Sequence, residues 1–302
     1  MSHNHSHSHS HSHSHSHNSK YLSIAFFITV SFMIVEVIGG YLSNSLALLS
    51  DAGHMLSDSL ALALSFFAMK MGQKAKTESK TYGFQRTEIV AALINGVTLI
   101  FIAGLICFEA FQRFVEQPEI KVPEMLTVAS IGLLVNIISA YILHKGSEES
   151  LNVKGAYLHV LGDALGSVGA IVGGIIILYT GYYFVDQIIS IVIAILILVS
   201  SINLLKETTD ILLEGTPKQV DFQKIKKSLL GLESIDSVHD LHIWSLTSGQ
   251  NILTCHLVSN QNSDSNTLLE KANELLKSKF KVSHTTIQIE KANSKIQCEK
   301  CN

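Results

Sequence analysis

Six long apolar segments occupy the first two thirds of this 302-residue chain and limit its possible folds more than any other feature. Each is close to the roughly 20 residues that a helix needs to cross the hydrocarbon core of a bilayer. Only 16% of the residues are charged, against about a quarter in soluble domains. We therefore predict a multi-pass α-helical membrane protein whose six transmembrane helices occupy residues 21–210. The segments lie at about Tyr21–Tyr41, Leu46–Met71, Ile89–Phe111, Met125–Leu143, Ala156–Tyr179 and Phe184–Leu205.

The charges between these segments predict the orientation of the chain in the membrane. The loops after the first, third and fifth segments lie on one side of the membrane. They carry only Arg113 and Lys121, which neighbouring glutamates offset. Because cytoplasmic loops hold the excess of lysine and arginine, both termini are expected in the cytoplasm. The basic residues that favour this orientation follow the second and fourth segments: Lys70, Lys74, Lys76, Lys80, Arg86, Lys145 and Lys154.

Residues 1–20 alternate histidine with serine or asparagine and hold eight of the fifteen histidines. Such a tract cannot build a core, so we expect a disordered tail that captures metal ions weakly through many imidazoles. An expression tag is the alternative, which we disfavour because tags are normally uninterrupted histidine runs. No cleavable signal peptide is evident, and the four cysteines are too scattered for a disulfide framework.

Polarity rises after the sixth segment. Residues 211–217 have the composition of a linker, in which Gly215 suits the left-handed position after a helix and Pro217 prevents its continuation. Residues 218–292 have the pattern of a small α+β domain, and residues 293–302 that of a flexible tail. The expected elements are a helix at Val220–Leu230, strands at Ser237–Leu246 and Ile252–Ser259, a helix at Asn266–Phe280 and a strand at His284–Lys291.

Two matched pairs of ionisable residues interrupt the apolar segments. His54 and Asp58 are four residues apart in the second segment, and His159 and Asp163 repeat this spacing in the fifth. On a helix, residues four apart share one face, one turn apart. Ionisable groups at bilayer depth are costly and rare unless they have a partner or a function. Two such helices side by side would offer four ligands to one divalent metal ion.

The types of these ligands indicate the metal class. Zn²⁺ favours four-coordinate sites of histidine nitrogens and carboxylate oxygens, and two aspartates would neutralise its charge. Mg²⁺ and Ca²⁺ use oxygen ligands almost throughout, so Zn²⁺, Co²⁺, Cd²⁺ or Ni²⁺ is expected. Hydrogen bonds that serve helix packing are the alternative role. Asp51, one turn before His54, either orients that imidazole or serves as a charge at the helix N-terminus.

The same ligands suggest how transport could be driven. An imidazole titrates near pH ~6.5, so protons and metal ions compete for it at physiological pH. A site that faces the two sides of the membrane in turn would release metal in one direction and return protons in the other. We therefore expect proton-coupled antiport by alternating access.

The sequence resembles the cation diffusion facilitator family of zinc transporters over nearly the whole chain after the histidine tail. The resemblance implies a six-span homodimer with cytoplasmic ferredoxin-like domains that bind metal and tighten the pairing, and export of divalent metal in exchange for protons. It places His54, Asp58, His159 and Asp163 at the family's transport site, in the two-histidine form of the zinc and cobalt–zinc–cadmium branches. Besides both pairs, the stretches that carry it are Tyr82-Gly-Phe-Gln-Arg-Thr-Glu88, Ser150-Leu-Asn-Val-Lys-Gly-Ala-Tyr157, Asp240-Leu-His-Ile-Trp-Ser-Leu246 and Thr286-Ile-Gln-Ile-Glu290.

The resemblance also implies metal ligands in the soluble domain. His239 and His256 match positions that bind metal in relatives, and His284 and Glu290 share one face of the last strand by its two-residue period. Ordinary surface polar residues are the alternative for this quartet. In relatives a carboxy-terminal Cys-x2-Cys joins the cluster of metal ligands; here Cys298 and Cys301 have ligand spacing and either bind metal with a partner subunit or stay free thiols.

A charge interlock is a further implication. In relatives a basic residue at the position of Arg86 pairs with an acid near the end of the sixth span, for which Asp210 and Glu214 are the candidates. A plain cytoplasmic-interface charge is the alternative for Arg86. Asn95, Asn136 and Asp186 either line the passage or form interhelical hydrogen bonds.

Several classes of function fit the sequence less well. A net charge of −3 without a basic patch argues against a nucleic-acid partner. An intramembrane metalloprotease is disfavoured because it needs an open zinc position and a general base, and no His-Glu-x2-His motif occurs. A metal sensor or storage protein is the alternative to a transporter. Eukaryotic relatives often carry their histidine-rich segment between spans four and five, so the N-terminal histidines favour a bacterial plasma-membrane exporter.

Overall fold

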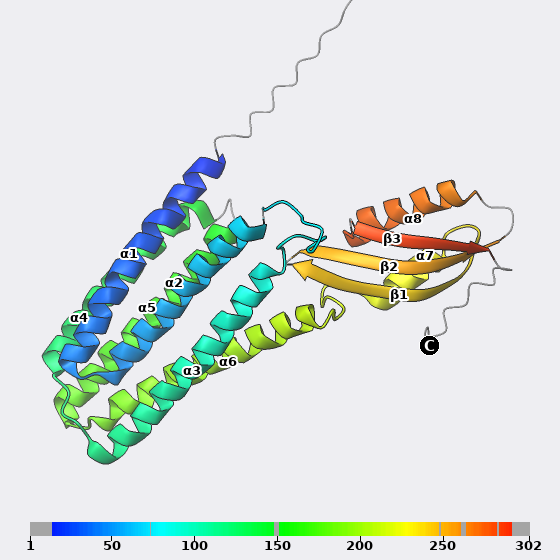
Figure 1. Cartoon of the computed structure of the whole chain (residues 1–302). Coiled ribbons are helices and arrows are strands. Elements are labelled where there is room, and N and C mark those ends of the chain that lie inside the picture. The colour runs from blue at the N-terminus through cyan, green and yellow to red at the C-terminus, as the bar shows by residue number, and fades with distance from the viewer. Residues whose placement is uncertain are drawn as a thin grey trace, which may run out of the picture. The chain divides into compact units, whose positions relative to one another are not determined.

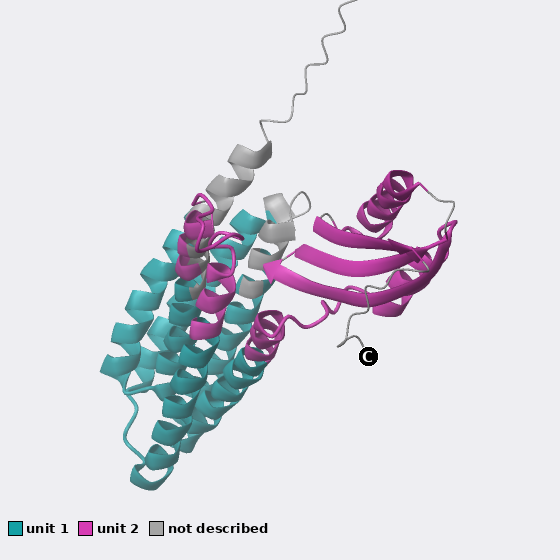
Figure 2. Cartoon of the chain, turned by 45° about the vertical axis from the view of Figure 1, so that its right-hand side comes forward, with its two compact units in different colours: residues 1–62, 95–202 teal, residues 63–94, 203–302 magenta. Residues whose placement is uncertain are grey.

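The structure, a computed structural model, describes the backbone of residues 14–72, 74–147, 151–247, 249–260, 264–282 and 284–291. Within these ranges the side chains of residues 14–23, 25, 58, 61–62, 65–66, 68–69, 145–147, 151–156 and 159 lie outside the description. The chain divides into one unit of residues 1–62 and 95–202 and a second of residues 63–94 and 203–302 (Figure 2).

Six long helices follow one another in the first two thirds of the chain (Figure 1). Five of them have the length and apolar composition of membrane spans: α1, α3, α4, α5 and α6. The sixth, α2, is the helix that carries Asp51, His54 and Asp58. The chain is therefore a multi-pass α-helical membrane protein, as predicted. The bounds are α1 Ser14–Ser43, α2 Leu46–Gly72, α3 Thr87–Glu116, α4 Val122–Ser147, α5 Leu151–Thr180 and α6 Phe184–Leu212.

The first unit is held together by close helix contacts around α4, which packs against both α1 and α5. A Cβ at Gly132 of α4 would lie 2.6 Å from the ring of Phe32 on α1, so only glycine allows this approach. The Asn136 side-chain amide donates to the Ser167 hydroxyl on α5 at 3.4 Å. Small residues and interhelical hydrogen bonds are the usual means of packing helices in a membrane. Asn136 therefore has the interhelical role that we named as one alternative.

Asp186 at the start of α6 holds the N-terminus of α2. Its carboxylate accepts hydrogen bonds from the Ser45 hydroxyl at 2.6 Å and from the Leu46 and Ala47 amides at 2.7 and 3.3 Å. The first amides of a helix have no partner within the helix, and a carboxylate there is favoured by the helix dipole. Asp186 is thus a capping group supplied by another helix, which fixes where α2 begins.

The helix α6 ends differently from the prediction. Gly215 was expected in the left-handed position, but Glu214 has the left-handed φ of +59°. The Gly215 amide then bonds back to the Asp210 carbonyl at 2.8 Å, which is the bond that closes a helix C-terminus. A left-handed conformation costs a residue with a Cβ roughly 1–2 kcal/mol, so Glu214 is held there against its local preference.

The carboxy-terminal part folds as a three-stranded sheet covered by two helices (Figure 1). The order α7 Phe222–Leu230, β1 Ile235–Thr247, β2 Gln250–Ser259, α8 Ser265–Phe280 and β3 His284–Lys291 matches the prediction. β2 lies in the middle, antiparallel to β1 and parallel to β3, which it reaches through α8. The two helices contact each other and share one core with the inward side chains of β2, namely Leu253, Cys255 and Leu257.

Candidate metal sites

The intramembrane pairs lie in regular helix, as their spacing requires. His54 and Asp58 fall inside the continuous helix α2, and His159 and Asp163 inside α5. The side chains of Asp58 and His159 lie outside the described part of the structure. Of the other two, His54 is half-buried and Asp163 is 4% exposed. Each pair therefore sits on one helix face, one turn apart.

The contact between α2 and α5 sets the relative depth of the two pairs. The Asp51 carboxylate oxygen lies 3.4 Å from the point that a Cβ of Gly166 would occupy. Ala47 and Leu48, at the start of α2, pack in one cluster with Ala170 and Ile177, toward the end of α5. The two helices are therefore antiparallel.

In an antiparallel pair, each step forward on one helix is matched by a step backward on the other, because both rise 1.5 Å per residue. Three residues from the contact of Asp51 with Gly166, the backbones of His54 and Asp163 reach the same level. Four residues further, Asp58 and His159 do so. The backbones thus place one histidine and one aspartate at each of two successive levels.

Asp51 and Glu36 extend this polar region away from the pairs. Asp51 is 6% exposed and its carboxyl hydrogen-bonds that of Glu36 on α1, which is 1% exposed. The sequence interpretation missed Glu36. A signal was present, because Glu36 is the only charged residue in the apolar segment of residues 21–41. Whether Asp51 orients His54 stays a prediction.

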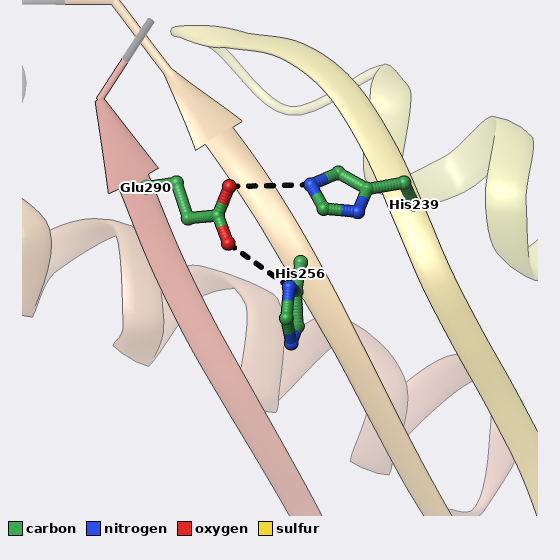
Figure 3. A group of neighbouring side chains, drawn as sticks. All are labelled: His239, His256 and Glu290. Atoms are coloured by element: carbon green, nitrogen blue, oxygen red, sulfur yellow. Dashed lines mark hydrogen bonds and ion pairs between the residues drawn. The ribbon is translucent and has the colours of Figure 1, made fainter. Parts of the chain in front are cut away.

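Three side chains of the cytoplasmic domain form a compact set of metal-ligand type. His239, His256 and Glu290 each offer one ligand atom, and these atoms lie within 4.8 Å of one another. Figure 3 shows the carboxylate of Glu290 facing both imidazoles. Its two oxygens are 3.2 Å from His239 Nε2 and 2.9 Å from His256 Nδ1. The three residues come from three different strands, β1, β2 and β3.

The sheet register explains how residues so far apart in sequence meet. His239 pairs directly with His256 across β1 and β2, and Glu290 pairs with Val258, two positions along β2. Leu257 points into the core under the helices, so His256 and Val258 point to the opposite, helix-free face. Glu290 is only 7% exposed there, so its charge needs a partner.

A β-bulge brings a fourth side chain, Asp240, to the cluster. The register between β1 and β2 shifts between His239 and His242, and Asp240 takes a left-handed φ of +49°. Its two oxygens lie 2.7 Å from His242 Nε2 and 3.6 Å from His256 Nε2. His256 therefore has Glu290 at one ring nitrogen and Asp240 near the other. Strict alternation along the strand would have placed the Asp240 side chain on the face of the sheet opposite to that of His239. The sequence pattern could therefore not reveal its place in the cluster.

The structure corrects the predicted quartet at one residue. His284 pairs with Ile252 at the start of β3, and its ring contacts Tyr82 with centroids 6.2 Å apart. It does share a strand face with Glu290, but six residues of strand separate them by about 20 Å. The same-face argument was right and the distance along the strand rules His284 out of the cluster. Cys298 and Cys301 lie outside the described residues.

The three clustered side chains fit a metal ion. They supply two imidazole nitrogens and a carboxylate, which is a common zinc donor set and leaves a fourth position open. His256 Nδ1 is buried and makes no hydrogen bond of good geometry, although a carboxylate oxygen of Glu290 is 2.9 Å away. A metal between them would satisfy both atoms. Cys255 belongs to the core instead, where burial raises the pKa of its thiol to about 12.

The charge interlock has a partner in the second unit. The Arg86 guanidinium donates to the Glu214 carboxylate at 3.0 Å. Asp210 was the other candidate. Its backbone carbonyl accepts the hydrogen bond that closes the end of α6, and among the described residues the ion pair of Arg86 is with Glu214. The Thr247 hydroxyl at the end of β1 also donates to Glu88 at 2.5 Å, so the stretch after α2 is tied to the sheet.

These features define a class of protein. It is a multi-pass membrane protein with paired histidines and aspartates in its helices, followed by an α+β domain that carries a cluster of metal-ligand type. The model of the cation efflux transmembrane domain matches residues 22–213, and that of the cytoplasmic domain of cation efflux proteins matches residues 217–292. The chain belongs to the cation efflux family. This confirms the family expected from its motifs.

Three relatives align over most of their length. The chain is 46% identical over 295 residues to the cadmium, cobalt and zinc/H(+)-K(+) antiporter of Bacillus subtilis (strain 168), covering 96% of this chain and 92% of that protein. It is 43% identical over 276 residues to the metal cation efflux system protein CzcD of Cupriavidus metallidurans, covering 91% and 87%. It is 46% identical over 293 residues to the zinc transporter ZitB of Pectobacterium atrosepticum, covering 96% and 89%.

Proposed function

We propose that this protein exports divalent metal ions from the cytoplasm, with Zn²⁺ as the main substrate and Co²⁺ and Cd²⁺ as further ones, in exchange for protons. The observation that carries the proposal is the antiparallel contact of Asp51 with Gly166, which sets His54 level with Asp163 and Asp58 level with His159. The names of the relatives support the substrates, since they include zinc, cobalt, cadmium and H⁺.

The proposed chemistry follows from the donor set. Two imidazoles and two carboxylates complete a four-coordinate site, and the two negative charges balance a divalent ion. A neutral loaded site lowers the cost of holding the ion at bilayer depth. When the site opens to the side from which protons enter, protonation of the imidazoles lowers metal affinity and releases the ion. Return of the protonated site then completes one antiport cycle.

The setting of the protein is part of the proposal. We place it in a bacterial plasma membrane as a homodimer with both termini in the cytoplasm. The basic residues after the second and fourth spans support the orientation, and the bacterial relatives support the membrane. The match to the cytoplasmic domain of cation efflux proteins supports the dimer.

The cytoplasmic cluster has a separate role in this proposal. His239, His256 and Glu290 would hold a resident metal, which adds a fixed charge between three strands and stabilises the domain. Cys298 and Cys301 would add soft ligands from the carboxy-terminal tail, and the histidines of residues 1–20 would raise the local metal concentration. No transport step passes through this second site.

The test is metal uptake into proteoliposomes with an imposed pH gradient. Zn²⁺, Co²⁺, Cd²⁺, Ni²⁺ and Mn²⁺ are compared with purified wild type and with Asp163→Ala. Gradient-dependent uptake of Zn²⁺ above Mn²⁺ is expected for wild type, and loss of it for Asp163→Ala, with dimer assembly unchanged in size-exclusion chromatography. Normal transport by Asp163→Ala would refute the site, and uptake that ignores the pH gradient would refute the antiport.

A further inference from the structure

A small cavity in the second unit is lined by charged, polar and aromatic side chains and belongs to neither metal site. Its volume is about 220 Å³. Its wall is formed by the stretch between α2 and α3, by the residues after α6 and by the end of β1, all within the second unit. The lining residues with polar or aromatic side chains are Tyr82, Gln85, Arg86, Glu214 and Trp244.

Two polar atoms of these residues are buried without a partner. Arg86 Nε carries a donor hydrogen and Gln85 Oε1 is an acceptor, and neither has a hydrogen-bond partner among the described residues. Burial of an unpaired polar group is unfavourable, so such atoms normally have a partner, which can belong to a ligand. The two neighbouring residues thus offer one donor and one acceptor to a group in the cavity.

The charges around the cavity have both signs. The Arg86 guanidinium donates to the Glu214 carboxylate through Nη2 at 3.0 Å, which leaves Nε for another acceptor. A Cβ at Gly83, another residue of the wall, would lie 3.6 Å from Lys76 Cγ, so a second basic side chain borders the cavity. A simple anion would meet Glu214 and a simple amine would meet Arg86. A ligand with one anionic and one cationic group therefore matches the wall best.

The chain itself places this cavity at a membrane surface. Arg86 directly precedes α3, and the apolar part of this membrane span begins at Ile89. Three residues of helix rise about 5 Å, and the headgroup layer on each side of the hydrocarbon core is roughly 5–8 Å thick. Gln85 and Arg86 therefore lie at the level of the lipid headgroups. Tyr82 and Trp244 are of the residue types enriched at that level.

We propose that this cavity binds the phosphoethanolamine headgroup of a membrane lipid. The phosphate would accept a hydrogen bond from Arg86 Nε, and the ammonium would donate to Gln85 Oε1 and face the Glu214 carboxylate. The rings of Tyr82 and Trp244 would add cation–π contacts with the ammonium. Both charges of the headgroup are then balanced, and both buried atoms have partners.

The test uses the fluorescence of Trp244, which lines the cavity and is the only tryptophan of the chain. The whole detergent-solubilised chain is titrated with dihexanoyl phosphatidylethanolamine, and we expect a saturable change in emission. Dihexanoyl phosphatidylcholine lacks the N–H donors and dihexanoyl phosphatidylglycerol lacks the cation, so each should bind at least about tenfold more weakly. Free phosphoethanolamine, which has no tails to enter the micelle, should also bind at least about tenfold more weakly.

Gln85→Met nearly keeps the length of the side chain and removes the amide oxygen, so it should weaken binding of the ethanolamine lipid about tenfold. Gln223→Met, at an exposed position of α7, is the matched control and should bind as wild type does. Arg86→Lys keeps the charge beside Glu214 but removes the guanidinium, and its loss of affinity decides the matter if Gln85→Met does not fold.

Three results would overturn the proposal. Equal binding of the three lipids, or wild-type affinity in Gln85→Met and Arg86→Lys, would exclude this headgroup. Binding of free phosphoethanolamine as tight as that of the lipid would exclude the membrane as its source. An emission of Trp244 that does not respond to the ethanolamine lipid would exclude the site.

Discussion

The two candidate metal sites use the same kinds of donor but are built in opposite ways. In the membrane, the four proposed ligands form two pairs at the spacing of one helical turn, and each pair depends on a single helix. In the cytoplasmic domain, His239 and Glu290 are 51 positions apart and meet only because three strands keep their register. The intramembrane site depends on how two helices lie against each other, whereas the sheet site depends on a hydrogen-bonded ladder.

This difference suggests a division of labour. Helices that contact each other through side chains can shift or tilt without breaking their own hydrogen bonds, which a site with alternating access requires. Strands cannot slide without breaking the ladder between them. A site of moving helices therefore suits release of a substrate, and a site on a fixed sheet suits retention of a metal. Each prediction below tests one side of this contrast.

The largest expected effect is the separation of the two sites by single substitutions. In an Asp163→Ala background, which removes the intramembrane site, His256→Ala should lower the remaining Zn²⁺ affinity at least about 100-fold, because it deletes an imidazole nitrogen that lies 2.9 Å from the Glu290 carboxylate. In the wild-type background, His256→Ala should keep gradient-driven transport. Isothermal titration and proteoliposome uptake give the two readouts.

His284→Ala is the control for this prediction, since His284 lies on the same strand face as Glu290 but outside the cluster. It should leave the affinity unchanged. If His256→Ala abolished transport as completely as Asp163→Ala does, the two sites would not be separate, and the contrast between substrate and resident metal would fail.

The second prediction concerns ion preference in the membrane. His54→Asp replaces one imidazole by a carboxylate and leaves the other three proposed ligands unchanged, so the donor set becomes richer in oxygen. The ratio of Mn²⁺ to Zn²⁺ uptake should rise about tenfold, because oxygen donors favour harder ions. His144→Asp, at an exposed position of α4, should leave the ratio unchanged. An unaltered ratio in His54→Asp would mean that His54 does not contact the transported ion.

The helical parts of the protein were predictable because their code is local. Apolar length gave the six helices, and the four-residue spacing gave both intramembrane pairs without knowledge of the packing. The relative depth of the two pairs could not be predicted from either helix alone. It follows from the contact of Asp51 with Gly166, which the structure shows and no sequence pattern contains. Glu36 was missed for another reason, since it is a single charged residue in its apolar segment and no repeated pair marks its position.

The sheet site was less predictable because its code is non-local. The two-residue period correctly assigned His284 and Glu290 to one face, but it could not say which of them lies beside His256. That depends on the register between β2 and β3. The bulge at Asp240 breaks the alternation itself, so a residue expected on the other face joins the cluster. Glu214 shows the same limit, because it holds the left-handed position that Gly215 was expected to fill.

The third prediction uses the backbone strain at Asp240. Asp240→Gly should bind Zn²⁺ at the sheet site about tenfold more weakly, because the carboxylate near His256 Nε2 is lost. The same change should not lower the free energy of unfolding, since glycine accepts the φ of +49° without cost. Asp240→Ala should lose as much affinity and also about 1 kcal/mol of stability. Fluorescence of Trp244, the only tryptophan, follows unfolding of this domain. Equal affinity in wild type and Asp240→Gly would show that Asp240 only shapes the turn.

The smallest effect is expected at the caps of the helices that cover the sheet. The Asp264 carboxylate accepts hydrogen bonds from the Thr267 hydroxyl and amide at 2.7 and 3.0 Å at the start of α8. These bonds hold the pKa of the Asp264 carboxyl below its usual value. A lowered pKa means that the cap stabilises the folded domain fully above about pH 4 and is lost as pH falls through the folded-state pKa.

Asp264→Ala should therefore lower the midpoint of thermal unfolding near neutral pH, and the difference from wild type should shrink as the pH falls below about 4. Asp264→Ser retains a capping oxygen that does not titrate. Its unfolding midpoint should therefore stay close to that of wild type at neutral pH. It should not show the additional fall in acid that protonation of the Asp264 carboxylate causes in wild type. Trp244 fluorescence of the detergent-solubilised protein gives these midpoints. A difference between wild type and Asp264→Ala that persists unchanged in acid would mean that the carboxylate is not the capping group.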